Sequence, residues 1–223
     1  MKDIDAIALL QDPVRRRLYE YVAAQGREVG RNEAAEAAGV TRTLAAHHLD
    51  RLAGAGLLET GSRRLTGRSG PGAGRPAKVY TRARAERSVS LPARDYRTAA
   101  ELLAEAAEEA GLDAGLGAAA RRRGEALRAA AGPCGDLAAA ADLLAARGYE
   151  PYPERAEGPD REALRMRNCP FHAVAEHFPP LVCGMNLALL EGWLGTDGAL
   201  RARMDPRPGE CCVVVEESKN NDD

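Results

Sequence analysis

The sequence predicts a mainly α-helical protein that ends in a smaller α+β part, and three observations support this fold class. Hydrophobic residues make up 45% of the 223 residues but aromatic residues only 4%, so alanine and leucine supply most of the burial, which favours helices over a large β-sandwich. Apolar residues recur at helical spacing over most of the chain. Short segments typical of strands appear only around residues 56–81 and after residue 148.

The first 55 residues predict four helices. Asp12 is a favoured N-cap residue, and Pro13 suits the first position of the second helix. A third helix spans residues 32–38 and ends at Gly39, which tolerates the left-handed backbone after a helix end. The first helix is a short amphipathic turn or two with Ile4, Ile7, Ala8 and Leu10. The residues of the second and third helices that are expected to face inward are Val14, Leu18, Tyr21, Val22, Ala34, Ala35 and Ala38.

The fourth helix runs from Arg42 to about residue 55 and has two distinct faces, with Thr41 as the expected cap. The inward arc holds Leu44, Ala45, His48, Leu49 and Leu52. The opposite arc, flanked by Arg42 and Arg51, holds Thr43, Ala46, His47 and Asp50. Small polar residues at the start of a helix suit entry into the DNA major groove, where the backbone must approach the bases closely. We expect His48 in the core and His47 on the surface.

Two short strands follow this helix, at residues 56–59 and 77–81, and the loop between them is rich in glycine and arginine. A basic loop between two strands, directly after a helix-turn-helix, is typical of a wing that lies along phosphates or enters the minor groove. The sequence therefore predicts a winged helix-turn-helix domain over residues 1–87. Its expected DNA-binding residues are Thr41, Arg42, Thr43, His47, Arg51, Arg63, Arg64, Arg68, Arg75 and Lys78.

The charge distribution agrees with a DNA partner for this half. Residues 1–87 contain 16 Lys and Arg against 10 Asp and Glu, a net charge of +6, and the rest of the chain carries −8 because the whole chain carries −2. A basic half is attracted to the polyanionic backbone of DNA, whereas an acidic half is not.

The segments "LLQDPVRRRLYEYV", "AAGVTRTLAAHHLDRLAGAGLLE" and "GRPAKVY" resemble the winged-helix reader of the ArsR-like regulators, and more closely that of the SufR-type repressors. This resemblance covers about residues 4–83. It implies a homodimer that binds a palindromic double-stranded DNA operator, usually as a repressor.

Residues 88–131 are predicted to form a helical connector. Apolar residues recur at helical spacing from Ala99 to Ala110, glycines interrupt the pattern over residues 111–117, and a helix resumes at Ala118. Alanine-rich helices with a narrow apolar stripe suit close helix–helix contact. Dimerisation and packing onto the C-terminal domain are equal alternatives for this segment.

Residues 132–217 predict a small α+β domain with a sheet covered on one side. We expect a helix over residues 136–147, strands over 149–155 and 163–168, helical structure over 171–194 with a break at the proline pair, and a last strand over 211–216. Residues 218–223 are expected to be a disordered tail.

The cysteines of this domain are its candidate chemical site. Cys169, Cys183, Cys211 and Cys212 each lie at the expected start or end of an element, where side chains from separate segments can converge, and thiolates suit iron–sulfur clusters or zinc. Because strand side chains alternate, only one of the adjacent pair is expected to join Cys169 and Cys183. His172 is a weaker candidate ligand. The isolated Cys134 is expected to be structural.

The segments "NCPFH", "PPLVCGMN" and "PGECCVV" resemble the SufR-type sensor domain, whose cysteines hold an iron–sulfur cluster. The resemblance implies that Cys169, Cys183 and one of Cys211 and Cys212 are ligands. We expect a DNA-binding regulator that responds to redox or iron status. Zinc or a reversible disulfide at the same cysteines is the alternative, and an enzyme with Cys169 as nucleophile and His172 as base is a third.

The sequence shows no signal-peptide core and no stretch of about 18 apolar residues that would span a membrane. We therefore expect a cytoplasmic protein with no membrane contact, in which cysteines more often serve metal or redox chemistry than structural disulfides.

Overall fold

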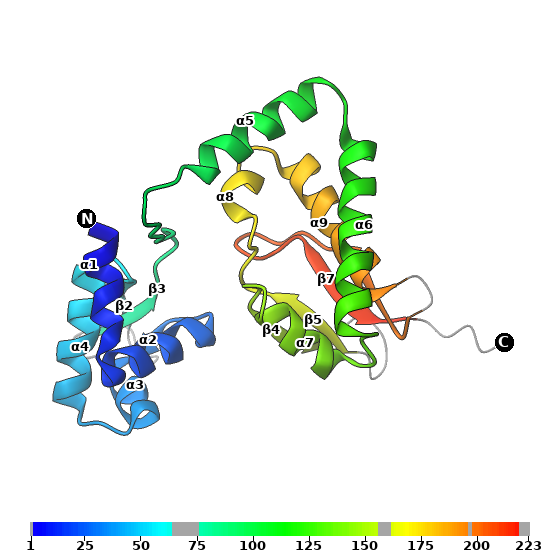
Figure 1. Ribbon diagram of the computed structural model, residues 1–223. Helices are drawn as coiled ribbons and strands as arrows, with labels where there is room; N and C mark the ends of the chain where they lie inside the picture. Colours follow the sequence, from blue (N-terminus) through cyan, green and yellow to red (C-terminus); the bar gives the residue numbers. More distant parts are fainter. Residues whose placement is uncertain (1, 64–75, 156–161, 196–197, 219–223) are drawn as a thin grey trace. The chain divides into compact units, whose positions relative to one another are not determined.

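The computed structural model describes residues 2–63, 76–155, 162–195 and 198–218. The chain folds into two compact units, Met1–Arg94 and Asp95–Asp223, which we call unit 1 and unit 2 (Figure 1).

Unit 1 packs helices against a small antiparallel sheet whose strand order is β1-β3-β2. Its helical elements are α1 (Lys2–Ala8), the 3-10 turn η1 (Leu9–Gln11), α2 (Pro13–Gln25), α3 (Arg31–Ala38) and α4 (Arg42–Gly54). Its strands are β1 (Val29–Gly30), β2 (Leu58–Arg63) and β3 (Ala77–Arg82). The predicted helix-turn-helix and hairpin are therefore present, and β1 is a short strand that the sequence analysis missed.

Local signals in the sequence fix the ends of these helices. The Asp12 carboxylate accepts the backbone N–H groups of Val14 and Arg15 at 2.9 and 3.0 Å, which satisfies donors that the first turn of α2 leaves free. Gly39 ends α3 with a φ of 66°, a conformation that glycine adopts without a Cβ clash. The Thr41 hydroxyl accepts the N–H of Leu44 at 3.3 Å and so begins α4.

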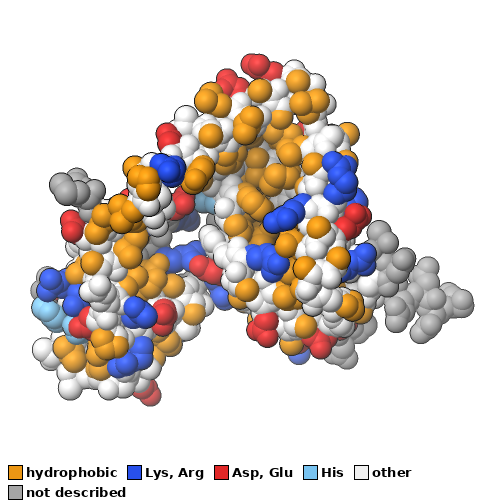
Figure 2. Space-filling model, viewed as in Figure 1, with side chains coloured by type: hydrophobic (Ala, Val, Ile, Leu, Met, Phe, Trp, Pro, Cys, Tyr) orange, Lys and Arg blue, Asp and Glu red, His pale blue; other side chains and the backbone are white. Residues whose placement is uncertain are grey.

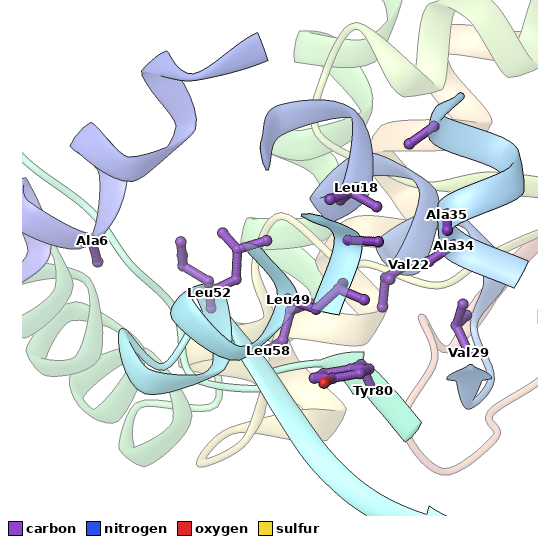
Figure 3. Close-up of a cluster of buried hydrophobic side chains, with 13 residues drawn as sticks. Ala6, Leu18, Val22, Val29, Ala34, Ala35, Leu49, Leu52, Leu58 and Tyr80 are labelled. Atoms are coloured by element: carbon purple, nitrogen blue, oxygen red, sulfur yellow. The ribbon is translucent and has the colours of Figure 1, made fainter. Parts of the chain in front are cut away.

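One hydrophobic core holds unit 1 together. Figure 3 shows its side chains converging from the helices and the sheet, with the Tyr80 ring of β3 lying below Leu49 of α4. Leu18 and Val22 of α2 are fully buried beside Leu49. Because α4 places its inward arc in this core, its opposite arc is left on the surface.

Unit 2 is an α+β domain. Its helices are α5 (Tyr96–Glu109), α6 (Asp113–Ala131), α7 (Leu137–Ala145), α8 (His172–Ala175) and α9 (Pro179–Leu194). Its strands β4 (Pro151–Arg155), β5 (Glu162–Met166), β6 (Leu200–Met204) and β7 (Val213–Glu217) form an antiparallel sheet in the order β4-β5-β7-β6. In Figure 1 the long helices α6 and α9 run beside each other, and α7 lies next to β4 and β5.

Two glycines allow α6 and α9 to pack closely. A Cβ built at Gly124 of α6 would overlap the carbonyl oxygen of Leu189, and one built at Gly192 of α9 would overlap the carbonyl oxygen of Arg121. The two backbones are therefore in direct contact, which any larger side chain at either position would prevent.

The two faces of the unit 2 sheet differ in chemistry. Leu164, Val215 and Ala202 share the face that packs against Trp193 and Leu190 of α9. The other face carries Arg165, which is 2% exposed and pairs with Glu154 and Asp205. Here Arg201 and Arg203 also pair with Glu216. Because these charges neutralise each other in pairs, the polar face tolerates a buried guanidinium.

The structure differs from the sequence analysis in the organisation of the second half. The segment 88–131 is not a separate connector, because α5 and α6 belong to unit 2 and α6 packs along α9. The break between these helices covers only residues 110–112. The strand β6 was missed, although Leu200, Ala202 and Met204 alternate with Arg201 and Arg203 as expected for a strand with one apolar face. Ser218 is bonded to Ala199 and Gly198, and the rest of the expected tail lies outside the described residues.

Candidate functional site

The outer face of α4 is polar and accessible. Arg42, Thr43, His47 and Arg51 are all exposed, while the oxygen of Thr41 is used as the helix cap. The expected core histidine His48 is buried, and burial is the main cause that lowers its pKa. Leu44 was expected to face inward but is 40% exposed, whereas the next residue, Ala45, is fully buried. The exposed face therefore combines two arginines with small and polar side chains.

A polar cluster fixes α4 to the rest of unit 1. The Tyr80 hydroxyl donates to a carboxylate oxygen of Asp50 on α4 at 2.6 Å and accepts from Arg31 Nε at 2.9 Å. Lys78 Nζ pairs with the same carboxylate oxygen at 2.6 Å. Burial disfavours the ionised carboxyl, but the hydrogen bonds from Lys78 and Tyr80 outweigh it and lower the pKa of Asp50. Burial, together with the hydrogen bond to Asp50, raises the pKa of Tyr80 to about 12.

The remaining expected DNA contacts belong to the hairpin. Arg63, at the end of β2, is half-exposed and lies 3.6 Å from a carboxylate oxygen of Glu28. Lys78 of β3 is held by Asp50 and lies over the Tyr80 ring, 5.5 Å from its centroid. Arg64, Arg68 and Arg75 lie outside the described residues. In the described part of the hairpin, the Arg63 side chain is therefore half-exposed at the end of β2, whereas the Lys78 side chain is held against Asp50 of α4.

Four of the five cysteines gather in unit 2 from three separate segments. Cys169 lies in the turn between β5 and α8, Cys183 lies in the second turn of α9, and Cys211 and Cys212 directly precede β7. Cys183 and Cys212 form a disulfide with a Cα–Cα distance of 6.3 Å. Cys169 and Cys211 are free thiols that interact with each other, which raises the pKa of Cys169 and lowers that of Cys211 to about 7. We call these four residues the cysteine group.

Both members of the adjacent pair take part, which differs from the sequence analysis. The alternation expected for a strand does not decide their partners, because β7 begins only at Val213. The backbone N–H of Cys211 donates to the carbonyl of Met166, at the end of β5. The carbonyl of Cys212 accepts from the N–H of Asp205, directly after β6, so the two adjacent cysteines are bonded to different strands' ends. The buried Cys211 side chain therefore meets Cys169, and the half-buried Cys212 side chain meets Cys183 on α9.

A buried polar pair that the sequence analysis missed contacts the cysteine group. Asn186 of α9 is fully buried, and its side-chain Nδ2 donates to the sulfur of Cys211 at 3.4 Å. The Tyr149 hydroxyl donates to Asn186 Oδ1 at 2.6 Å, and burial raises the pKa of Tyr149. The only sequence signal for Asn186 was its place three residues after Cys183, on the same face of a helix.

The other two candidate groups in unit 2 lie apart from this chemistry. The His172 side chain is exposed, and its Nε2 lies 3.2 Å from a carboxylate oxygen of Glu176, the residue directly after α8. Cys134 is buried, its Sγ is 3.6 Å from the carbonyl oxygen of Asp136, and burial raises its pKa. The structural role expected for Cys134 agrees with its place in the core.

The cysteine group offers fewer free ligands than a metal centre needs while its disulfide is formed. Among the residues that the structure describes, no three His, Cys, Asp or Glu side chains are placed to hold one metal ion. With Cys183 and Cys212 joined, two thiols remain beside them. Reduction of the disulfide adds two free thiols to the pair Cys169 and Cys211. Four thiolates are the usual donor set of an iron–sulfur cluster and a common one for structural zinc. The reduced group therefore fits such a centre in its donor chemistry.

The class of protein follows from unit 1. In this unit α2 and α3 pack beneath α4, the outer face of α4 is exposed, and the hairpin of β2 and β3 follows α4. This is the winged helix-turn-helix architecture of DNA-binding transcriptional regulators. A family model described as a helix-turn-helix domain matches residues 9–61, from η1 into β2. No curated protein and no solved structure matches the chain.

None of the described helices combines the length and the apolar composition that crossing a membrane requires.

Proposed function

We propose that this protein is a homodimeric, DNA-binding transcriptional repressor whose unit 2 senses redox or iron status through the cysteine group. The observation that carries the sensing proposal is that four cysteines from three chain segments form two contacting pairs, Cys183 with Cys212 and Cys169 with Cys211. A buried N–H donor, that of Asn186, contacts Cys211. The DNA-binding part rests on the exposed face of α4 and on the helix-turn-helix match.

In this proposal α4 enters the major groove. Thr43 and His47 would face base edges, and Arg42 and Arg51 at the two sides of the helix would contact phosphates. The cluster of Asp50, Tyr80 and Arg31 would keep α4 at a fixed angle to the hairpin, so that helix and wing bind as one body. Arg63, Arg64, Arg68 and Arg75 would add salt-dependent attraction to the backbone.

In the reduced protein Cys169, Cys183, Cys211 and Cys212 would hold an iron–sulfur cluster. Such a cluster, when bound, supplies one-electron redox chemistry and sensitivity to oxygen and iron supply. The Asn186 N–H group stabilises negative charge on the Cys211 sulfur, and the Tyr149 hydroxyl keeps the amide in that orientation. Trp193, Leu190 and the apolar strand residues exclude water from the same core.

A second candidate is a metal-free thiol switch, and the Cys183–Cys212 disulfide specifically favours it. That bond links α9 to the segment before β7, so its reduction removes a covalent constraint from the core of unit 2. Zinc held by the reduced thiols is the remaining alternative at the same residues.

Anaerobic reconstitution with ferrous iron and sulfide tests the sensing proposal. We expect bound iron and acid-labile sulfide with visible charge-transfer absorption, and loss of these signals in Cys169→Ser but not in the matched Cys134→Ser variant. Protein that binds zinc instead of iron and sulfide would support the zinc alternative. Protein that binds no metal, and whose DNA affinity changes only when the disulfide is reduced, would support the thiol switch.

DNA binding is tested separately with sequences selected from a random duplex library. Fluorescence anisotropy over a salt series should show that Arg51→Gln lowers the slope of log K against log salt by about 1. The control variant Arg122→Gln, on the exposed side of α6, should keep the wild-type slope. Failure to select any sequence would contradict the assignment as a DNA-binding regulator.

A further inference from the structure

One acidic residue lies on the side of α4 that the proposed function turns toward DNA. Asp50 belongs to the outer arc of this helix, three residues after His47 and seven after Thr43, and its side chain is 44% exposed. In Figure 2 basic side chains and a histidine gather at the surface over α4. A carboxylate in this place repels the phosphates of an approaching duplex, so the contacts that it makes within the protein decide what it does there.

Two cations of unit 1 are bound to this carboxylate. Lys78 Nζ of β3 lies 2.6 Å from Asp50 Oδ1, and Arg31 Nη2, at the start of α3, lies 3.0 Å from Asp50 Oδ2. Both cations belong to elements other than α4, so the Asp50 carboxylate joins α3, α4 and β3. The side chains of Lys78 and Arg31 are 39% and 30% exposed, and solvent therefore reaches both of them.

A buried phenol fixes the geometry of these three charges. The hydroxyl of the fully buried Tyr80 donates to Asp50 Oδ1 at 2.6 Å and accepts from Arg31 Nε at 2.9 Å. The charged groups of Lys78 and Arg31 also lie over the Tyr80 ring, 5.5 and 5.9 Å from its centroid. An aromatic face attracts cations at this distance. The two cations are therefore held both by the carboxylate and by the ring.

This restraint changes what the two cations contribute to DNA binding. A lysine or arginine side chain that extends freely can follow a phosphate, and such contacts strengthen binding to every sequence alike. A move of Lys78 or Arg31 to a phosphate must first break charge-assisted hydrogen bonds to Asp50. The free energy of that exchange lowers the sequence-independent attraction that the two cations supply.

We infer that Asp50 is a positioning residue that limits the sequence-independent affinity of unit 1 for DNA, because it holds Lys78 and Arg31 away from the phosphates. The inference rests on the DNA-binding part of the proposed function and adds a determinant of binding strength to it. It also assigns Lys78, which the sequence predicted as a DNA contact, to a network within the protein. Arg51 on the same helix keeps the role of a phosphate contact.

Fluorescence anisotropy over a sodium chloride series, with a duplex of random sequence as the probe, tests the inference. Asp50→Asn should raise the magnitude of the slope of log K against log salt by about 1–2, because one or both cations become free to bind phosphates. At about 0.1 M salt it should tighten binding by about 10-fold for each cation released. Glu20→Gln removes the same charge from an exposed residue of α2 outside this network and is the matched control. It should keep the wild-type slope.

A lysine variant separates the release of a cation from the loss of a negative charge. Lys78→Gln should change the slope little while Asp50 is present, whereas the same substitution added to Asp50→Asn should lower the slope by about 1. Circular dichroism checks that each variant is folded. Because Lys78→Gln retains Asp50, its slope tests the inference even where Asp50→Asn does not fold.

An Asp50→Asn variant with the wild-type slope, or with weaker binding, would overturn the inference, because a carboxylate that only orients α4 would give that result. A Lys78→Gln variant that loses a slope of about 1 in the presence of Asp50 would overturn it as well. Both results leave the DNA-binding assignment standing, since the wild type binds the duplex in each. A wild type that binds no duplex at any salt concentration would contradict that assignment and the inference together.

Discussion

The side-chain amide of Asn186 donates a hydrogen bond to the sulfur of Cys211 at 3.4 Å, inside the core of unit 2. The same amide is fixed from its other end by Tyr149, so its N–H group cannot turn away without leaving a buried acceptor unpaired. A neutral donor held in this way favours the thiolate form of the cysteine. Cys211 is therefore the thiol of the cysteine group with the strongest local support for negative charge.

Asn186→Ala should raise the pKa of Cys211 above its value of about 7, because one of the donors that stabilise the thiolate is lost while the thiol stays buried. The interaction with Cys169 is the larger cause of the lowered pKa, so the shift should be partial. Thiolate absorbance across a pH titration of metal-free protein, with the Cys183–Cys212 disulfide kept intact, checks the change. Asn168→Ala is the control, because Asn168 donates to the Gly148 carbonyl and not to a sulfur. An unchanged titration in Asn186→Ala would mean that this hydrogen bond has no influence on Cys211.

Metal-free protein exposed to air should show three free thiols after denaturation without reductant, from Cys134, Cys169 and Cys211, and five after reduction. Thiol titration gives the counts, and mass spectrometry of the peptides identifies the linked pair. Cys183→Ser should leave every remaining cysteine free. A disulfide between any other pair would contradict the arrangement described above.

Gly192→Ala should lower the free energy of unfolding of unit 2 by about 1–3 kcal/mol, since the added methyl group must displace the backbone of α6 at Arg121. Urea denaturation followed by circular dichroism measures the loss. Gly184→Ala, on the same helix, has no atom within 4 Å of its new Cβ and should be neutral or slightly stabilising. Equal stabilities of the two variants would show that α6 and α9 are not in backbone contact.

Arg165→Met should destabilise unit 2 by about 3–5 kcal/mol, because the Glu154 and Asp205 carboxylates lose the buried guanidinium that neutralises them. Arg207→Gln removes a half-exposed partner of the same Glu154 and should change stability little. Urea denaturation at neutral pH compares the two. Equal losses of unfolding free energy in the two variants would contradict the claim that the buried Arg165 contributes more stability than the half-exposed Arg207.

Much of unit 1 could be predicted from the sequence, because its signals are local. Asp12 with Pro13, Gly39 and Thr41 mark helix ends within a few residues, and the inward arc of α4 follows from helical periodicity. The exposed face with Arg42, Thr43 and His47 is what that periodicity leaves outside. The prediction for Leu44 was wrong, since helical periodicity gives the direction of a side chain but not how far the core extends.

In unit 2 the sequence could supply the residue types but not their partners. It pointed to Cys169, Cys183, Cys211 and Cys212 as one site, yet it could not tell how they pair or that Asn186 and Tyr149 lie beside them. It also separated α6 from the domain to which it belongs, because two glycines 68 positions apart in the sequence show no sign of mutual contact.

The sequence by itself determined the ends of the helices α2, α3 and α4, the inward and outward faces of α4 and the presence of a cysteine-bearing second half, because each depends on residues within one or two helical turns. Only the tertiary structure decided which cysteines meet, how closely α6 and α9 pack and that Asn186 and Tyr149 lie beside Cys211. Those relationships depend on contacts between distant segments, which are fixed when the backbone of the whole unit closes around its core.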